Sequence, residues 1–184
     1  MQKTRMQEKY EKEVVPALKK ELGETNINAV PKFVKVTINV GLKHGIKDSK
    51  FVDAVEKTLI KISGQKPVKT LARKSIAGFK IREGNTVGMA VTMRGRRMYD
   101  FIDKLINLTM PRMRDFRGLP PKSVDAHGSM SIGFREFIAF PEINPEDSET
   151  THGLEITVVT NAGTRERGLA LFKTVGFPFR STQK

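Results

Sequence analysis

The sequence predicts an α+β fold, with a mostly antiparallel sheet, helices packed on one face and long basic loops. Segments with the 3.6-residue period of amphipathic helices are interleaved at short spacing with segments of two-residue period rich in β-branched residues. The chain has 184 residues, 38% of them hydrophobic, which is enough for a single core. No window approaches the run of about 18 apolar residues that a membrane span needs.

Apolar residues recur at helical spacing in four segments. In the first segment, residues 6–22, Pro16 should kink the helix or start a second one, and Gly23 ends it. In the second, Asp48 or Ser49 can supply the cap and Gly64 lies just beyond the end. The expected helices, in order, cover residues 6–22, 49–63, 98–110 and 165–175.

Five segments are interpreted as strands, two of them, 33–40 and 87–94, because apolar residues alternate there with polar or small ones. They cover residues 33–40, 68–71, 87–94, 134–140 and 154–161. Alternation places Thr37 and Asn39 on one face of the first strand, and Thr92 and Arg94 on one face of the third. These side chains could form a polar surface beside Gln65 and Lys66, or an ordinary solvated sheet face; the pattern favours neither.

Two stretches are expected to be long loops. Residues 72–86 contain Gly and Asn and show no sustained period, which predicts an exposed basic loop or hairpin tip. Within it, Phe79 is either tucked into the core or exposed as a platform on which bases stack. Residues 111–133 are punctuated by Pro and Gly, and loops of that length are usually functional or disordered.

Charge indicates the class of partner. The formal net charge is +13, and residues 61–98 hold ten basic residues against one acidic residue. Such a field attracts polyanions, so nucleic acid is the favoured partner. A membrane is disfavoured, because the basic residues lie among Gly, Pro, Ser and Thr rather than opposite a bulky apolar stripe. A sequence-tolerant RNA chaperone or single-strand binder would carry the same charge.

Catalytic patterns are weak. The chain has no Cys, so thiolate metal sites and a Cys nucleophile are excluded. His44, His127 and His152 lie far apart in loop contexts and are interpreted as surface histidines, without a metal site. A metal-dependent nuclease that uses His127 and His152 is the remote enzymatic alternative. We expect no enzyme, no cofactor and no metal.

Seven motifs arrive in an order typical of one family. They are INVG (38–41), SGQKP (63–67), ARKSIAGFKIREG (72–84), VTMRGRRM (91–98), PRMRDFRGL (111–119), GFREFIAFPEI (133–143) and GFPFR (176–180). Together they resemble the bacterial form of universal large-ribosomal-subunit protein five, over residues 10–180. The sequence departs from the family's pattern at Lys43-His44, Asn85-Thr86 and Ala90. These departures affect the expected shapes of the local loops and one expected phosphate contact.

The resemblance implies a non-enzymatic, ribosome-bound protein of the cytoplasm. Its implied role is to bind 5S rRNA and help attach it to the large-subunit rRNA in the central protuberance. It also implies contacts with the P-site tRNA, a small-subunit head protein and neighbouring large-subunit proteins. Residues 10–180 would form a single RNA-binding domain, and residues 1–9 and 181–184 are candidates for disorder.

The family's contacts transfer by motif. The 5S rRNA contacts fall on Asn39, Gln65 and Thr92, and the basic residues beside them are Lys66, Lys69 and Arg94. The tRNA-contacting loop falls on Ala77, Gly78, Phe79, Lys80, Ile81 and Arg82. The bridge to the small subunit falls on Arg112, Arg114, Arg117, Glu146 and Asp147, the last two being acids that suit a basic partner.

Overall fold

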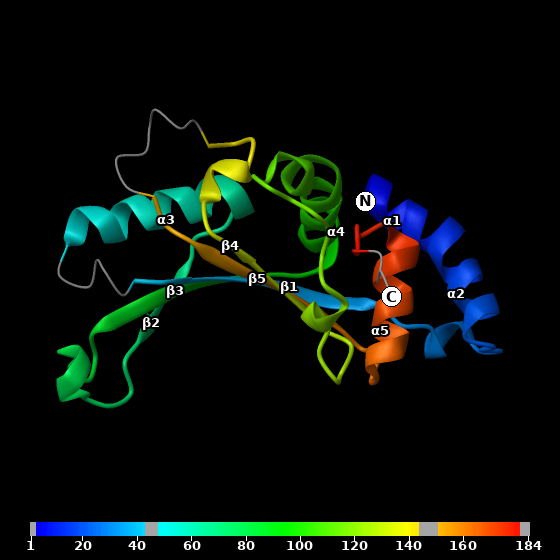
Figure 1. Ribbon diagram of the computed structural model, residues 1–184, viewed down its shortest axis with the longest axis horizontal. Helices are drawn as coiled ribbons and strands as arrows, with labels where there is room; N and C mark the ends of the chain where they lie inside the picture. Colours follow the sequence, from blue (N-terminus) through cyan, green and yellow to red (C-terminus); the bar gives the residue numbers. More distant parts are fainter. Residues whose placement is uncertain (1–2, 43–47, 144–150, 181–184) are drawn as a thin grey trace. The chain divides into compact units, whose positions relative to one another are not determined.

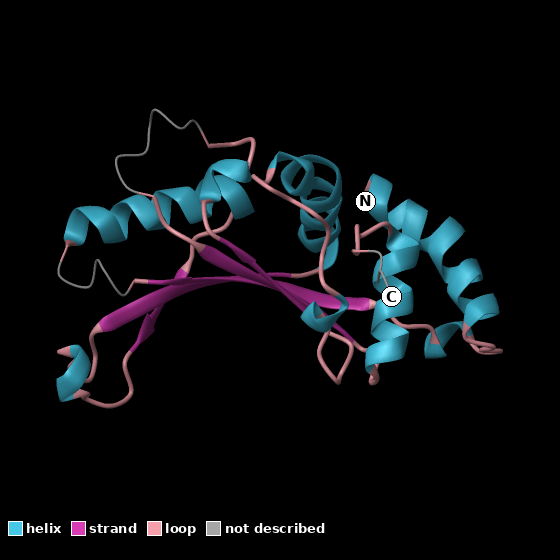
Figure 2. Cartoon of the chain, viewed as in Figure 1, coloured by secondary structure: helices cyan, strands magenta, loops and turns pink. Residues whose placement is uncertain are grey.

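The computed structural model describes residues 3–42, 48–143 and 151–180 and confirms the α+β class (Figure 1, Figure 2). An antiparallel sheet has the strand order β2-β3-β1-β5-β4. Its strands are β1 (Phe33–Gly41), β2 (Val68–Leu71), β3 (Thr86–Met93), β4 (Met130–Phe134) and β5 (Leu154–Thr160). The α-helices are α1 (Arg5–Lys9), α2 (Val15–Glu21), α3 (Ser49–Ser63), α4 (Gly95–Lys104) and α5 (Arg165–Val175).

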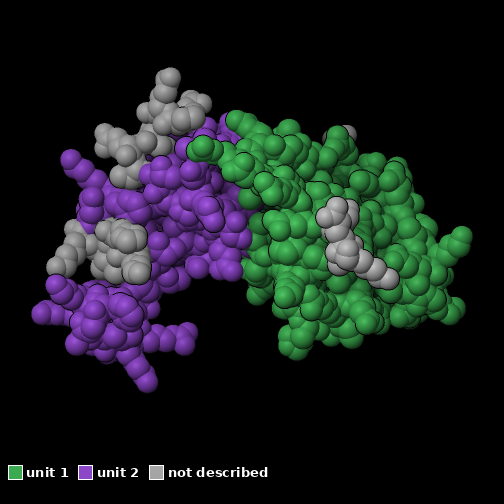
Figure 3. Space-filling view, viewed as in Figure 1, with its two compact units in different colours: residues 1–36, 93–132, 157–184 green, residues 37–92, 133–156 purple. Residues whose placement is uncertain are grey.

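The chain divides into two compact units (Figure 3). Unit 1 comprises residues 1–36, 93–132 and 157–184, and unit 2 comprises residues 37–92 and 133–156. The expectation that residues 10–180 act as one domain stays a prediction. The tail 181–184 and residues 1–2 lie outside the described residues.

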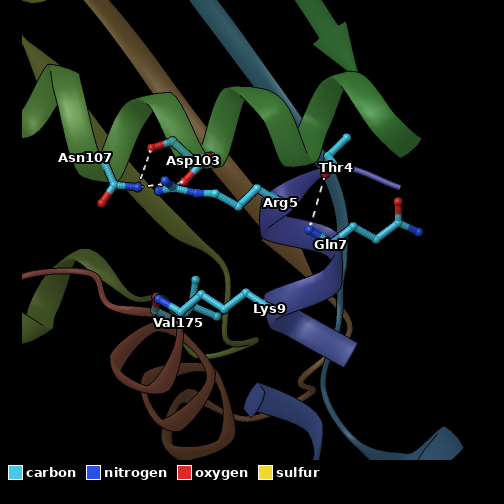
Figure 4. A network of polar contacts seen from close by, with 7 residues as sticks. All are labelled: Thr4, Arg5, Gln7, Lys9, Asp103, Asn107 and Val175. Atoms are coloured by element: carbon cyan, nitrogen blue, oxygen red, sulfur yellow. Dashed lines mark hydrogen bonds and ion pairs between the residues drawn. The ribbon is translucent and has the colours of Figure 1, made fainter. Parts of the chain in front are cut away.

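The N-terminal segment of unit 1 is helical where the sequence left it as a candidate for disorder. The Thr4 hydroxyl accepts a hydrogen bond from the Gln7 N–H at 3.2 Å and so caps α1, whose Met6 is 2% exposed. Arg5 pairs with Asp103 at 3.1 Å, and Lys9 donates to the Val175 carbonyl at 3.1 Å (Figure 4). These contacts hold residues 4–9 against α4 and α5. The structured part of the chain therefore begins before residue 10, where the resemblance to the family begins.

Two prolines in unit 1 sit inside continuous helical segments, and each follows a π-helical turn. A π turn, η1 (Tyr10–Val14), joins α1 to α2 ahead of Pro16, and η4 (Leu105–Thr109) extends α4 ahead of Pro111. In both, the residue before proline donates to the carbonyl five positions earlier. A proline ring clashes with the carbonyl four positions earlier in a regular α-helix. The wider turn accommodates that ring, so Pro16 does not end the helix.

Aromatic rings form the centre of unit 1. Tyr10 packs on Phe33 with ring centroids 6.3 Å apart and on Tyr99 at 6.1 Å. Its hydroxyl donates to the Pro31 carbonyl at 2.8 Å. Burial, with a smaller contribution from Tyr99, raises the pKa of Tyr10 to about 12. The ring therefore stays neutral throughout the physiological range.

In unit 2, α3 lies along one side of the strands (Figure 1). The Asp48 carboxylate caps α3 by accepting from the Lys50 N–H at 3.0 Å, which settles the choice between Asp48 and Ser49. The core of this unit is formed by apolar residues of α3 and of the alternating strands, namely Val55, Leu59, Ile62, Ile38, Val40, Met89 and Val91, all at most 3% exposed. The opposite face of β1 and β3, called the open face below, carries the exposed or half-buried residues Thr37, Asn39, Ala90 and Thr92.

The strand predicted over residues 134–140 is wrong. β4 ends at Phe134, and residues Phe137–Ala139 form a 3-10 turn, η7. Phe134, Phe137 and Phe140 are buried and are spaced by three, which is the period of a 3-10 helix. A spacing of three does not fit the two-residue period of a strand, in which Phe137 would lie on the face opposite Phe134 and Phe140. The long stretch 111–133 likewise contains the 3-10 turns η5 (Met110–Arg112) and η6 (Pro121–Ser123) and the start of β4.

His152 is not the surface histidine that the sequence predicted. It is 7% exposed, and its ring stacks on Phe137 with centroids 4.4 Å apart and meets Phe51 edge-on at 6.4 Å. Its Nδ1 lies 3.4 Å from the Gly153 carbonyl, and its buried Nε2 has no hydrogen-bond partner among the described residues. Desolvation lowers the pKa of His152, outweighing the hydrogen bond to Gly153.

This histidine should make stability depend on pH. Its pKa in the folded state lies below the value of about 6.5 that it keeps when unfolded. Below about pH 7 the unfolded chain therefore binds more protons, and the free energy of unfolding falls as the pH falls, until the folded-state pKa is passed. Urea unfolding between pH 8 and pH 5 measures the slope. His152→Phe, which keeps a ring at this position, should flatten it; an equal slope in both proteins would contradict the assignment.

Candidate nucleic-acid interface

The open face of β1 and β3 carries small and uncharged polar side chains. On β1, Asn39 is exposed and Thr37 half-buried, whereas Ile38 and Val40 between and beside them are buried. On β3, Ala90 and Thr92 are half-buried. The same-face prediction for Thr37 and Asn39 is therefore confirmed.

The strand register brings these residues together. The Leu42 N–H donates to the Val87 carbonyl at 3.0 Å, next to the antiparallel ladder of β1 and β3. Counting back along that ladder places Asn39 opposite Ala90 and Thr37 opposite Thr92. Asn39 and Thr92 are then diagonal neighbours on one face, with Cα atoms roughly 7–8 Å apart.

A glycine keeps this surface flat. A Cβ on Gly88 would lie 2.8 Å from the Thr70 hydroxyl oxygen and 2.9 Å from the Val40 carbonyl oxygen. Because β2 pairs with β3 in the register Val68–Ala90 and Thr70–Gly88, Gly88 lies on the open face between its neighbours on β1 and β2. A flat face made of small side chains lets a backbone or base edge approach closely.

Gln65 lies at the edge of this surface. It precedes β2 by three residues, at the end of the ladder where Thr92 lies, because Val68 pairs with Ala90. Its N–H donates to the Ser63 hydroxyl at 3.2 Å. Its buried Oε1 has no hydrogen-bond partner among the described residues, and leaving such an acceptor unpaired costs about 1–3 kcal/mol. A ligand that donates to this oxygen would recover that free energy once the side chain turns towards it.

The predicted basic residues divide between different places. Lys69 pairs with Met89, so it lies on the covered face rather than with Asn39, and its Nζ is 3.5 Å from a Glu56 carboxylate oxygen. Lys66 is exposed and reaches the same carboxylate at 4.0 Å. Arg94 is exposed directly after β3. Both lysines therefore reach towards Glu56 of α3, and Arg94 follows the end of β3. That these three basic residues contact rRNA stays a prediction.

The six residues of the predicted tRNA-contacting loop form an ordered hairpin tip. Ala77–Phe79 is a 3-10 turn, η3, at the far end of the β2–β3 hairpin (Figure 1). Below it, the Ile76 N–H donates to the Ile81 carbonyl at 2.9 Å, and the Ile81 N–H donates back at 3.2 Å. Lys80 closes the turn in the left-handed conformation with φ of 53°. The tip is thus a hairpin rather than an open loop.

The structure decides the question that the sequence left open for Phe79. Its side chain is exposed, at 66%, with Lys80 and Arg82 also exposed beside it. An exposed aromatic ring flanked by cations can stack on a base while the cations meet phosphates. The tip therefore offers the chemistry of a nucleic-acid contact.

The predicted bridge residues are only partly described. Arg112, Arg114 and Arg117 are all exposed in unit 1; Arg112 ends η5, and the other two follow it. The loop that carries them is held to the C-terminal segment, since the Leu119 N–H donates to the Pro178 carbonyl at 2.7 Å and Arg180 Nε donates to the Gly118 carbonyl at 2.9 Å. Glu146 and Asp147 lie outside the described residues.

Sequence reasoning missed Ser63 and placed His152 wrongly. Ser63 stands before the glycine that ends α3, and a serine at that position of a helix is a recognisable signal for a local side-chain hydrogen bond. For His152, the aromatic partners are distant in sequence, so no local signal was present.

Among the described residues, no group of three metal-binding side chains lies together. No helix in the described ranges is long and apolar enough to cross a membrane.

Comparison with known proteins agrees with these features. The family described as "Ribosomal protein L5" matches residues 26–82, and the family that describes the C-terminus of the same ribosomal proteins matches residues 86–179. The large ribosomal subunit proteins uL5 of Prochlorococcus marinus and Roseiflexus sp. are each 49% identical to this chain, over 96% of it and over 99% and 98% of their own lengths. The uL5 protein of Synechocystis sp. is 48% identical over 96% of this chain and 98% of its own. The chain therefore belongs to the uL5 family and is a structural, ribosome-bound protein of the large ribosomal subunit, not an enzyme, as the motifs predicted.

Proposed function

We propose that the open face of unit 2 binds 5S rRNA and helps attach it to the large-subunit rRNA in the central protuberance. The observation that carries the proposal is the register that groups Asn39 and Thr92 on one flat face, with Gln65 at its edge. Uncharged amides and hydroxyls can read the 2′-hydroxyl and base edges of RNA. The net charge of +9 over residues 61–98 supplies the attraction to phosphates.

The hairpin tip is proposed to contact the P-site tRNA. Support comes from the exposed ring of Phe79 and the neighbouring cations of Lys80 and Arg82. The backbone hydrogen bonds between Ile76 and Ile81 order the tip, so little conformational entropy is lost when it meets RNA.

The bridge to a small-subunit head protein extends the same proposal. It rests on the basic side chains of Arg112, Arg114 and Arg117 and on their motif, PRMRDFRGL. Neighbouring large-subunit proteins would complete the surroundings of the chain in the central protuberance.

The first test concerns the uncharged contacts. We expect Asn39→Ala, Gln65→Ala and Thr92→Ala each to weaken 5S rRNA binding about two- to tenfold, the effect of one lost hydrogen bond of about 0.5–1.5 kcal/mol. The slope of log affinity against log salt should not change, because no phosphate contact is lost. In contrast, Lys66→Ala should lower that slope by about 0.7–0.9 if it neutralises one phosphate. Binding is measured with labelled 5S rRNA, magnesium and near-physiological salt.

The control is Asn28→Ala, which removes an exposed asparagine of unit 1 outside this face. It should bind 5S rRNA like the native chain. Excess unrelated structured RNA serves as competitor in the same assay. Full competition would favour a sequence-tolerant RNA binder, and native affinity in all three alanine variants would remove the proposed site.

A further inference from the structure

We infer that Ser63 is a positioning residue for Gln65, and that it acts on RNA recognition only through that side chain. The inference rests on the 5S rRNA site proposed above. Ser63 is the last residue of α3 and is 9% exposed, so RNA does not need to touch it for it to matter.

The Ser63 hydroxyl joins the end of the helix to the start of the site. Its oxygen lies 2.6 Å from the Leu59 carbonyl oxygen and 3.1 Å from the Gln65 carbonyl oxygen, and it accepts from the Gln65 N–H at 3.2 Å. A hydroxyl has one proton to donate, and the shorter distance indicates that it is donated to the Leu59 carbonyl rather than to the Gln65 carbonyl. The hydroxyl thus donates to the helix and accepts from Gln65, fixing one relative to the other.

The chain on both sides of Gln65 is also constrained. Gly64 adopts the left-handed conformation, with φ of 66°, and its N–H donates to the Ile60 carbonyl at 2.8 Å. After Gln65, Pro67 is buried, and a proline favours an extended conformation at the residue before it, here Lys66. Within this short turn the Ser63 hydroxyl accepts from the Gln65 N–H and so constrains the backbone of Gln65 itself.

The side chain of Gln65 shows why its placement matters. Its Oε1 is buried and has no hydrogen-bond partner among the described residues, although its backbone is pinned. An acceptor in that state gains a partner when a donor on RNA, such as a 2′-hydroxyl or an exocyclic amino group, comes within reach. A shift of the backbone at Gln65 would change where that acceptor can reach when the side chain turns towards RNA.

A matched residue separates positioning from helix stability. Thr58 also lies on α3, is also 9% exposed, and its hydroxyl also donates to the carbonyl four residues earlier, that of Ala54, at 2.9 Å. No hydrogen bond joins Thr58 to Gln65 in the described part of the chain. Thr58→Val therefore removes a comparable hydroxyl of the same helix without touching the turn.

The test compares 5S rRNA binding with binding to unrelated structured RNA. We expect Ser63→Ala to weaken 5S rRNA binding about three- to tenfold and to leave the affinity for unrelated RNA unchanged, while Thr58→Val alters neither. In a chain that already carries Gln65→Ala, adding Ser63→Ala should change 5S rRNA affinity less than twofold. Ser63→Cys keeps the shape of the side chain with weaker hydrogen bonds, and gives the same comparison if the alanine variant folds poorly.

Three results would overturn the inference. Native 5S rRNA affinity in folded Ser63→Ala and Ser63→Cys, with Gln65→Ala impaired, would remove the positioning role and leave the proposed site intact. A loss of the same size in the presence and absence of Gln65→Ala would show that Ser63 acts through another group. Native affinity in Gln65→Ala itself would remove both the inference and the place of Gln65 in the proposed site.

Discussion

Phe172→Ala is expected to lower the free energy of unfolding by about 3–5 kcal/mol, the usual cost of deleting a fully buried phenylalanine side chain. Phe172 lies on α5 and is 0% exposed. Its ring centroid is 5.9 Å from that of Phe33 on β1 and 5.2 Å from that of Phe177, which it meets edge-on at 88°. The change would leave a cavity where three parts of unit 1 meet. Urea unfolding at pH 7 measures the loss.

The matched control is the same substitution at Phe79, whose ring is 66% exposed. Phe79→Ala should change the free energy of unfolding by no more than about 0.5 kcal/mol, because little apolar surface is buried there. Its cost should be seen instead in tRNA binding, where a stacked base contributes about 1–3 kcal/mol. Equal destabilisation by the two alanine variants would contradict the assignment of Phe172 to the core and of Phe79 to the surface.

Local patterns predicted the elements whose periodicity and end signals agree. For α3, apolar residues at helical spacing, the cap Asp48 and the terminal Gly64 all indicate one helix, and the structure has it from Ser49 to Ser63. For residues 134–140, the phenylalanines are spaced by three, which does not fit the two-residue period of a strand, and the strand prediction was wrong. The 3-10 turn forms there because it buries Phe137 and Phe140 together.

The candidate site was predictable only in part, since its residues come from different segments. Alternation along one strand placed Thr37 and Asn39 on one face, and this holds in the structure. Which face Lys69 takes depends on its pairing with Met89, a contact that no pattern within β2 reveals. The burial of His152 likewise depends on partners that are distant in sequence, Phe51 and Phe137. The sequence around Phe79 does not show whether a distant segment covers its ring.

The approach of two glycines in unit 1 was also invisible to periodicity. A Cβ built on Gly168 of α5 would lie 2.5 Å from both the Cα and the carbonyl oxygen of Gly128. Gly128 has φ of +83°, and its carbonyl accepts from the Thr160 hydroxyl at 2.7 Å, so the turn is tied to β5 and cannot easily withdraw. The helix reaches this turn only because both residues lack a side chain.

Gly168→Ala should therefore destabilise the chain although alanine favours helices. Overpacking of this kind costs about 1–3 kcal/mol, which exceeds the gain of about 1 kcal/mol that alanine brings to a helix interior. Gly133→Ala is the control for the added methyl group, because a Cβ there would meet nothing within 4 Å and its φ is ordinary. Gly163→Ala is the control for backbone strain, because a Cβ there would also meet nothing within 4 Å but its φ is +77°. Urea unfolding should show no loss for Gly133→Ala and a net loss for Gly168→Ala. A net gain in stability for Gly168→Ala would mean that α5 and the turn at Gly128 separate at little cost, and that their close approach does not hold unit 1 together.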